Sequence, residues 1–571
     1  MDSKSENIQV DVEKYIGEDS SKVSDNELTT KFKDFNDKFD AEKYGETQRK
    51  LSSRHVGLMI IGQSIGSGLF IGLSTPMVTS GSLSLFIGFV FYSVFVIWPL
   101  MQGVAEMCSF LPIKGSFLHY SARWVDPALG FTCTMIYLYT SLMFVALEAT
   151  AFAGVVAFWT DVNPGVFIAV ALVCTLFFNV FGVNWYGEIE FFASITKVLL
   201  IVGLMFFSLI SMCGGNPKGD AYGFENWPKG GLVKEYLVPG TTGRFLGFWK
   251  VMVYAAFSCG GPDLLGMIAG EVSRPRTVIP MAGRRAYIRI YIFYLGGLFF
   301  MASLCASNDP GLLAAKSGGA VGAAASPWVI GINNVGVHGL DSLVNVVIAL
   351  SAWSCGNGFM YGATRTAYAA SLAGYLPRFF SKCLRNGCPI YSVVGSILIA
   401  CIAFLSVNNS TGVVFNWLVN LSTTGILVTY LCMWWCYFKF KAAFKAQGFS
   451  EETDSYFRPS FFVHPYMTYF SCFLIAIILF FNGFWIFFPG NFSVADLFTS
   501  YFAPVFTVCL FVFWKFFKKT SFRTDLEADL LTGKQQIDDE EAIALAEYAA
   551  APRKSGIFWR IYYKTYDVCF G

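Results

Sequence analysis

The sequence predicts an all-α membrane protein with twelve transmembrane helices. Only 14% of the 571 residues are charged, whereas soluble domains average about 25%. Hydrophobic residues make up 55% of the chain and aromatic residues 18%, and this richness in aromatic rings suits lipid-facing and interfacial surfaces. Apolar stretches long enough to cross a bilayer recur along the chain, and two of them are interrupted midway by glycines.

Twelve stretches approach the ~20 apolar residues that a membrane-spanning helix needs. Their predicted bounds are 57–79, 83–104, 129–158, 164–183, 191–212, 246–270, 288–306, 341–371, 391–407, 413–438, 466–488 and 497–517. The ninth stretch is short, whereas the third and eighth are long enough to tilt or project beyond the bilayer. An even number of crossings places both ends of the chain on the same side.

The distribution of positive charge predicts that this side is the cytoplasm. Lys and Arg are concentrated in one alternate set of connections and are sparse in the other, as expected when basic loops stay inside. The basic residues of the first set are Lys114, Arg123, Arg274, Arg276, Arg284, Arg285, Arg289, Arg378, Lys382, Arg385, Lys439, Lys441, Lys445 and Arg458. The loop 214–244 is an exception, but it is long, and the asymmetry of the other loops outweighs it.

The chain divides into four predicted regions: a cytoplasmic N-terminal tail (1–54), a transporter core of helices 1–10 (55–440), helices 11–12 (441–517) and a cytoplasmic C-terminal tail (518–571). The N-terminal tail holds no apolar run, so no cleavable signal peptide is expected. A net charge of +2 gives no basic field for nucleic acid. The 15 cysteines are scattered and form no C-x-x-C pair; we interpret them as small hydrophobic residues, and we expect no metal and no cofactor.

Glycine-rich sequences interrupt the first and the sixth apolar stretch. The first reads Ile65-Gly66-Ser67-Gly68-Leu69-Phe70, and the sixth reads Phe257-Ser258-Cys259-Gly260-Gly261-Pro262-Asp263. One interpretation is that the glycines only let helices pack closely. However, interrupted spans at matching places in two halves are typical of inverted-repeat transporters, so we predict two five-helix repeats, spans 1–5 and 6–10, followed by two additional helices.

Broken helices inside a membrane would create a binding site for a zwitterion. The half-helix after a break begins with free N–H groups and a positive dipole end, which suit a carboxylate. We expect the N–H groups around Ser67, Gly68 and Leu69 to hold that carboxylate, and carbonyls near Phe257 and Ser258 to accept from an ammonium group. The other predicted binding residues are Ile65, Gly66, Gly260, Gly261 and Asp263.

Ionisable residues inside the membrane are costly and are functional candidates by default. Glu148 lies in the third span, Lys197 in the fifth, Asp263 just past the second break and Glu106 at the inner end of the second span. Lys197, Glu148 and Glu106 are therefore candidates for coupling transport to an ion. Three of these four residues also have a structural interpretation: Asp263 as a carboxylate that complements the helix dipole, Lys197 as a snorkelling side chain, and Glu148 as an acceptor from a neighbouring helix.

These motifs resemble those of the fungal amino acid permeases in the amino acid–polyamine–organocation superfamily. The resemblance covers about residues 54–440, with a further match in the tail at 529–533. The matching segments are Arg54-His55-Val56 through Phe70; Glu106 through Phe110 with Pro112, Gly115, Phe117 and Tyr120; Phe181-Gly182-Val183 with Tyr186 through Phe191; Gly270-Glu271 with Pro275-Arg276 and Pro280; and Ser351 through Asn357 with Thr364-Arg365.

The resemblance implies the inverted repeat also seen in leucine transporters, and proton-driven uptake at the plasma membrane. Lys197 resembles the lysine that occupies the sodium site in proton-linked relatives, and Phe257 the aromatic residue that closes over substrate. The implied partners are an amino acid, protons and membrane lipid. In the tails, Lys14 and Lys31 resemble ubiquitin acceptors, which implies a ubiquitin ligase and trafficking factors, and Cys569 resembles an acylated cysteine.

Two departures from the family pattern leave the substrate open. Gly261-Pro262-Asp263 stands where the family has G-T-E, and Gln63 stands where a small residue is common. Carnitine and polyamines therefore stay alternatives to an amino acid. A non-transporting nutrient receptor is a further alternative, although such proteins carry longer N-terminal extensions. A channel is disfavoured because no filter loop or charge ring is evident, and an enzyme because no metal cluster, nucleophile elbow or phosphate loop is evident.

Overall fold

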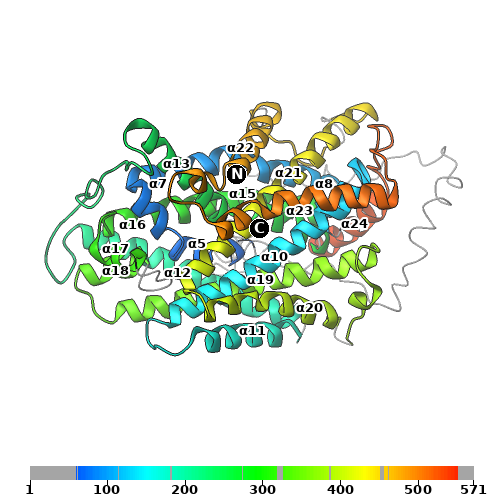
Figure 1. Cartoon of the computed structure of the whole chain (residues 1–571). Helices are drawn as coiled ribbons and strands as arrows, with labels where there is room; N and C mark the ends of the chain where they lie inside the picture. Colours follow the sequence, from blue (N-terminus) through cyan, green and yellow to red (C-terminus); the bar gives the residue numbers. More distant parts are fainter. Residues whose placement is uncertain are drawn as a thin grey trace, which may run out of the picture. The chain divides into compact units, whose positions relative to one another are not determined.

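The computed structural model describes residues 60, 62–113, 115–180, 183–272, 274–317, 326–384, 387–450, 455–460 and 462–550. These residues form helices joined by turns and loops, with no strand among them (Figure 1). The α-helices are α5 (Ser67–Phe70), α6 (Ser74–Ser80), α7 (Ser82–Tyr92), α8 (Trp98–Phe110), α9 (Phe117–Tyr120), α10 (Pro127–Val156), α11 (Pro164–Val180), α12 (Val183–Met212), α13 (Gly240–Ser258), α14 (Pro262–Ile268), α15 (Pro275–Ile290), α16 (Gly297–Leu304), α17 (Pro310–Ser317), α18 (Pro327–Asn334), α19 (Leu340–Leu372), α20 (Ile390–Ala400), α21 (Thr411–Ala446), α22 (Thr468–Phe480), α23 (Val494–Lys518) and α24 (Lys534–Ala550). The π-helical segments are η1 (Ser93–Ile97), η2 (Ser121–Val125), η4 (Tyr291–Gly296) and η8 (Val463–Met467), and the 3₁₀ segments are η3 (Ala269–Glu271), η6 (Arg378–Ser381), η7 (Cys401–Val407) and η9 (Phe484–Phe487).

Ten helical stretches of the described chain are long and apolar enough to cross a membrane. They are Ser82–Phe110, Pro127–Val156, Glu188–Met212, Gly240–Ile268, Pro275–Leu304, Leu340–Leu372, Ile390–Val407, Thr411–Ala446, Val463–Phe480 and Val494–Lys518. Each overlaps one of the predicted spans, which confirms the all-helical membrane architecture. Two predicted spans differ. The described part of the first is divided into short helices, and the fourth, α11, has 17 residues, a length of about 26 Å at 1.5 Å per residue.

The helices differ in how much of their surface the protein covers. Within their most apolar windows, the stretch Gly240–Ile268 is 94% buried and α10 is 83% buried, whereas α23 is 17% buried. α10 packs along both α19 and α21 (Figure 1). An apolar helix that is covered on all sides belongs to the interior of a bundle. The structure therefore places α10, α13 and α14 inside and leaves α23 at the periphery.

Local sequence explains where the interior helix α10 begins. Asp126 is its N-cap, with a carboxylate that accepts from the Ala128 backbone N–H at 2.7 Å, and Pro127 occupies the first helical position. Proline suits that position because its missing N–H is not needed there. The Asp126 carboxylate also accepts from Thr520 and from Lys515 of α23, so the cap joins the start of α10 to the end of the last apolar helix.

The chain that follows α23 packs against the ends of earlier helices. Arg123 donates to the Asp529 carboxylate at 2.8 Å, and the indole of Trp124 donates to the Asp529 carbonyl at 2.9 Å. Lys439, near the end of α21, forms an ion pair with Asp525 at 2.5 Å. The side chain of Leu530 is buried. Although the sequence suggests only a polar tail here, residues 523–532 are held by a set of specific contacts.

Helix α24 is attached to α15 through one arginine. Arg276, the second residue of α15, pairs with both Asp538 and Glu541, and its backbone N–H donates to Glu541 at 3.0 Å. Its guanidinium also lies 3.9 Å from the centroid of the Tyr456 ring. A single cation thus joins two carboxylates one turn apart on α24 to the start of α15.

Arg276→Gln is expected to release α24, because it removes the cation shared by Asp538 and Glu541. Removing one partner of a largely buried ion pair costs about 2 kcal/mol or more, which corresponds to an increase of about 30-fold in the detached population. Limited proteolysis of the purified protein would measure this as faster cleavage within residues 534–550.

Arg244→Gln is the matched control. Arg244 pairs with Glu235 at 3.7 Å, and both side chains are exposed, so this pair contributes little to stability. Equal cleavage rates in the two variants would contradict the role assigned to Arg276.

Candidate functional site

The first helix break lies at Ile65 and Gly66. Residues 62–64 are helical, the next two residues bend, and α5 begins at Ser67. Gly66 has φ −125° and ψ −153°, an extended conformation outside the helical region. The prediction of an interruption inside the first apolar stretch is confirmed by the conformation of these residues.

The second break separates α13 from α14. α13 ends at Ser258, and α14 begins with Pro262 at its first position and Asp263 in its first turn. Gly261 has φ +128°, a value that side chains with a Cβ rarely adopt. The sequence Gly-Pro therefore ends one helical segment and starts the next, as predicted.

A break in a helix frees backbone groups that water would satisfy outside a membrane, and here other helices satisfy them. Along the first break, four successive carbonyls accept bonds from side chains. The bonds are Lys197 Nζ to Gly62 O at 2.5 Å, Cys355 Sγ to Gln63 O at 3.1 Å, Tyr294 Oη to Ser64 O at 2.5 Å, and Ser351 Oγ to Ile65 O at 3.1 Å. Helices α12 and α19 and segment η4 therefore complete the backbone of the first break.

The two breaks are also bonded to each other. Tyr294, fully buried in η4, places its hydroxyl 2.6 Å from the Ser258 carbonyl as well as 2.5 Å from that of Ser64. The Ser64 hydroxyl lies 3.2 Å from the Gly260 carbonyl, and the Gly261 N–H donates to the Asp263 carboxylate at 3.3 Å. The two interrupted segments thus form one hydrogen-bonded unit.

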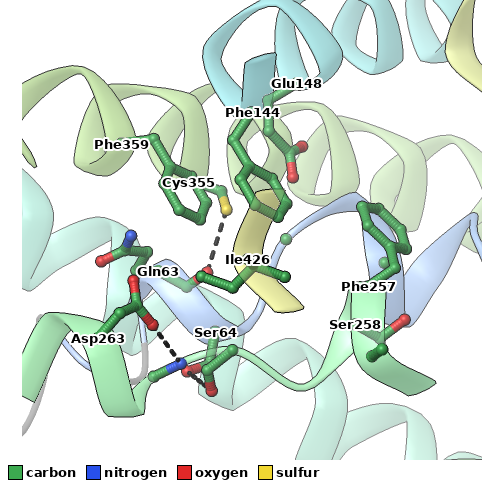
Figure 2. Close-up of a pocket in the computed structure, with 15 residues that line it drawn as sticks. Gln63, Ser64, Phe144, Glu148, Phe257, Ser258, Asp263, Cys355, Phe359 and Ile426 are labelled. Atoms are coloured by element: carbon green, nitrogen blue, oxygen red, sulfur yellow. Dashed lines mark hydrogen bonds between the residues drawn. The ribbon is translucent and has the colours of Figure 1, made fainter. Parts of the chain in front are cut away.

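A pocket lies where the two breaks meet (Figure 2). Its lining residues are Gln63, Ser64, Gly66, Gly68, Phe144, Glu148, Ala256, Phe257, Ser258, Gly260, Gly261, Asp263, Cys355, Phe359 and Ile426. The rings of Phe144 and Phe359 are stacked with centroids 4.2 Å apart, and Phe257 lies 6.1 Å from Phe144 and parallel to it. Figure 2 shows Gln63 and Asp263 at the left of the pocket, below Phe359, and Phe257 and Ser258 at the right. The pocket therefore combines an aromatic wall with polar groups on two sides.

The structure brings most of the predicted binding residues to this pocket. The predicted residues that line it are Gly66, Gly68, Phe257, Ser258, Gly260, Gly261, Asp263 and the coupling candidate Glu148. Ile65, Ser67 and Leu69 are buried beside it without lining it. The Ser67 N–H, predicted to bind a substrate carboxylate, donates to both oxygens of Glu148 at 3.3 Å. The position predicted for a substrate carboxylate at the start of α5 is thus occupied by Glu148 of the protein itself.

The remaining candidates lie elsewhere. Lys197 does not line the pocket; its ammonium group donates to the Gly62 carbonyl of the first break. Glu106 accepts from Tyr437 at 2.7 Å and pairs with Lys441 at 2.9 Å, so it connects the end of α8 with α21, away from the pocket. Cys569 lies outside the described residues.

Several pocket residues escaped the sequence reasoning. Phe144 lies one helical turn before Glu148, and Phe359 lies one turn after Cys355, so each pair shares a helix face. The position of Glu148 in an apolar span was a usable signal for Phe144, because residues four apart are neighbours on a helix surface. Tyr294 gave no such signal, since it is one of several tyrosines in an aromatic stretch.

The chemistry of the pocket is that of binding. Glu148 and Asp263 are its charged groups, and no Lys, Arg or His is among the described residues that line it. The Gln63 amide oxygen and the Ser258 hydroxyl are buried and have no hydrogen-bond partner within the described structure. Buried polar groups are normally bonded, so these atoms are available to a ligand. Pockets with an apolar wall and a few oriented polar groups are typical of small-molecule sites.

A bundle of apolar helices around a pocket at two helix breaks defines the class of membrane transport proteins. The comparison with known sequences identifies the family: a model of the amino acid permease family matches residues 55–527, and the chain belongs to that family. Its members are transporters, so the enzyme alternative is excluded.

Similar curated proteins are permeases from fungi. The chain is 36% identical over 501 residues to a proline-specific permease of Emericella nidulans, covering 87% of this chain and 90% of that protein. It is 39% identical over 505 residues to a probable proline-specific permease of Schizosaccharomyces pombe, with the same two coverages of 87% and 90%. It is 31% identical to a general amino acid permease of Saccharomyces cerevisiae over 87% of this chain and 84% of the relative. The resemblance to fungal amino acid permeases is thus confirmed.

Gly66→Ala is expected to lower the stability of the protein. A Cβ at this position would lie 2.6 Å from Cys355 Sγ and 2.6 Å from Glu148 Oε1, and such overpacking costs about 1–3 kcal/mol. The melting temperature in detergent should therefore fall. Gly203→Ala is the matched control, because no heavy atom lies within 4 Å of the added Cβ on α12. A melting temperature of Gly66→Ala equal to that of Gly203→Ala would contradict the close packing at the first break.

Proposed function

We propose that the protein is a secondary active transporter that takes up an amino acid across the plasma membrane, driven by the proton gradient. The observation that carries the proposal is a pocket at two hydrogen-bonded helix breaks. The residues of the breaks that line it are Gly66, Gly68, Phe257, Ser258, Gly260 and Gly261. Broken spans at matching positions of two repeats place a transported solute near the middle of the membrane. The family membership supports an amino acid as that solute.

The proposed architecture has twelve spans, with spans 1–5 and 6–10 as inverted repeats and two further helices. Ten apolar helices support it directly. The other two spans are residues 57–79, interrupted at Gly66, and α11, whose length of about 26 Å approaches the ~30 Å of a hydrocarbon core. The excess of basic residues on one set of connections supports cytoplasmic tails at both ends, where a ubiquitin ligase and trafficking factors would act.

Substrate binding is proposed to compete with Glu148 for the start of α5. The Glu148 carboxylate holds the Ser67 N–H, which the substrate carboxylate would take together with the N–H groups of Gly68 and Leu69. Glu148 can leave that N–H only if its charge is compensated by a proton or by Lys197, because an uncompensated charge in a low-dielectric site is costly. This competition supports the coupling of substrate to protons through Glu148 and Lys197.

The substrate ammonium is proposed to lie near Phe257 and Ser258. The Ser258 carbonyl lies 2.6 Å from the Tyr294 hydroxyl and shares its single proton with the Ser64 carbonyl, so it has a lone pair for another donor. The free Ser258 hydroxyl points to the same role. Phe257 and the ring pair Phe144–Phe359 would cover the carbon skeleton of the substrate.

The charges of the pocket favour neutral or cationic substrates. Asp263 and Glu148 would repel the side chain of a dicarboxylic amino acid, and no cation among the described lining residues offsets them. The relatives are named for substrates of different charge: proline-specific, lysine-specific and dicarboxylic amino acid permeases. Carnitine and a polyamine stay within the proposal, because both carry the positive charge that Asp263 would attract.

Uptake in cells that lack their own permeases tests the function. With external sodium replaced by choline, a labelled neutral or basic amino acid should accumulate at pH 5 and much less at pH 7.5. Excess unlabelled aspartate or glutamate should not compete. Uptake that requires sodium and ignores pH would refute proton coupling, and binding without flux would favour the receptor alternative.

Asp263→Asn tests the charge selectivity. Replacing the carboxylate removes a charge-assisted hydrogen bond of about 1.5–3 kcal/mol, so competition by lysine or spermidine, whose ammonium groups can donate that bond, should weaken about tenfold or more relative to competition by proline. The readout is the inhibition constant of each competitor against one labelled substrate. An unchanged ratio would show that Asp263 does not contact the substrate.

A further inference from the structure

A buried carboxylate that the sequence reasoning did not single out lies next to Lys197. Glu190 and Lys197 are separated by seven residues on α12, which places them on the same helix face two turns apart. Their side chains are 2% and 1% exposed, and Glu190 Oε1 lies 4.0 Å from Lys197 Nζ. Ionised side chains are rare inside membrane proteins and mark proton relays when they occur.

Glu190 lies directly against the segment that precedes the first break. A Cβ added to Gly62 would fall 2.3 Å from Glu190 Oε1, and Lys197 donates to the Gly62 carbonyl at 2.5 Å. The other carboxylate oxygen accepts from Ser354 of α19 at 2.9 Å. Glu190 therefore touches three elements at once: α12, α19 and the first interrupted span.

One oxygen of Glu190 is unsatisfied. Oε1 is buried and forms no hydrogen bond of normal geometry within the described structure; beside it lie the Ser194 hydroxyl, one turn further along α12, and Lys197 Nζ at 4.0 Å. By contrast, both oxygens of Glu148 accept from the Ser67 N–H. A buried carboxylate oxygen without a donor is stabilised by acquiring a proton of its own.

The charges around Glu190 are few. Lys197 on its own helix and the thiol of Cys355 on α19 face it, and Glu148 of α10 is within electrostatic reach of Lys197. The neighbouring elements α11, α16 and η4 contain no Asp, Glu, Lys, Arg or His. The Lys197 ammonium is thus shared by the carboxylates of Glu190 and Glu148. With all three side chains ionised, their net charge is −1 until one proton is added.

We propose that Glu190 carries the coupling proton. Its protonation state acts on the pocket through Lys197, which lies between Glu190 and the first helix break. The inference rests on the proton coupling proposed above. In the outward-facing state a proton from the medium binds Glu190 Oε1 and forms an O–H bond. Lys197 is then free to compensate Glu148, which gives up the Ser67 N–H to the substrate carboxylate. On the cytoplasmic side the substrate leaves, Glu148 returns to Ser67, and Glu190 releases its proton.

Glu190→Gln is the direct test, because glutamine keeps the size and the acceptor of the side chain but cannot exchange a proton. In proteoliposomes, the variant should lose substrate-driven proton uptake, and its accumulation ratio in a pH gradient should fall to about 1. Exchange of labelled for unlabelled substrate needs no net proton and should persist. The matched control is Glu188→Gln, an exposed position on the same helix, which should behave as wild type.

The outcomes separate the inference from the proposed function. A wild-type protein without pH-driven accumulation overturns proton coupling itself. A coupled wild type with an equally coupled Glu190→Gln overturns only the role of Glu190. Loss of both exchange and accumulation would give Glu190 a structural role and also overturn it.

Ser354→Ala provides a second test if Glu190→Gln does not reach the membrane. The Ser354 hydroxyl bonds the ionised carboxylate at 2.9 Å, so its removal favours protonated Glu190. Because uptake starts from the protonated form, the pH of half-maximal uptake should move upward, by about one unit for one charge-assisted hydrogen bond. An unchanged pH profile would overturn the proposal.

Discussion

Backbone groups exposed by a helix break have no water to bond with inside a membrane, and this constraint organises the structure. Four successive carbonyls, from Gly62 to Ile65, each receive a side-chain donor from another part of the bundle. The Tyr294 hydroxyl serves both breaks. The donors come from α12, α19 and η4, so the breaks exist only when these elements pack together. The same groups that stabilise the pocket therefore also connect it to α12, α19 and η4.

Local sequence information was sufficient for most of the helices and for the breaks. Apolar length identified the ten helices that are long enough to span a membrane. Gly66 and Gly261 marked the interruptions and Pro262 the restart of a helix, because each of these signals depends on the residue itself. Contacts between distant helices were not available from one sequence. The pairing of Glu106 with Lys441 and Tyr437, for example, depends on how α8 meets α21. Tyr294 and Glu190 were missed for the same reason.

Two residues in which this sequence departs from the pattern it resembles lie at the pocket. The chain matches the family model over residues 55–527, whereas its departures, Gln63 and Asp263, both line the pocket. The side chain of neither residue donates to the four backbone carbonyls of the first break. A change of either side chain would therefore leave the bonds to those four carbonyls in place, although Asp263 also accepts from the Gly261 N–H at the second break.

The attachment of the chain after α23 also has a consequence for biosynthesis. Asp525, Asp529 and Asp538 are among the last described residues to leave the ribosome, yet they neutralise Lys439, Arg123 and Arg276, which belong to helices inserted much earlier. Until translation ends, these basic groups stay without their carboxylates. A chain truncated before Asp525 would therefore leave Lys439, Arg123 and Arg276 without these carboxylates.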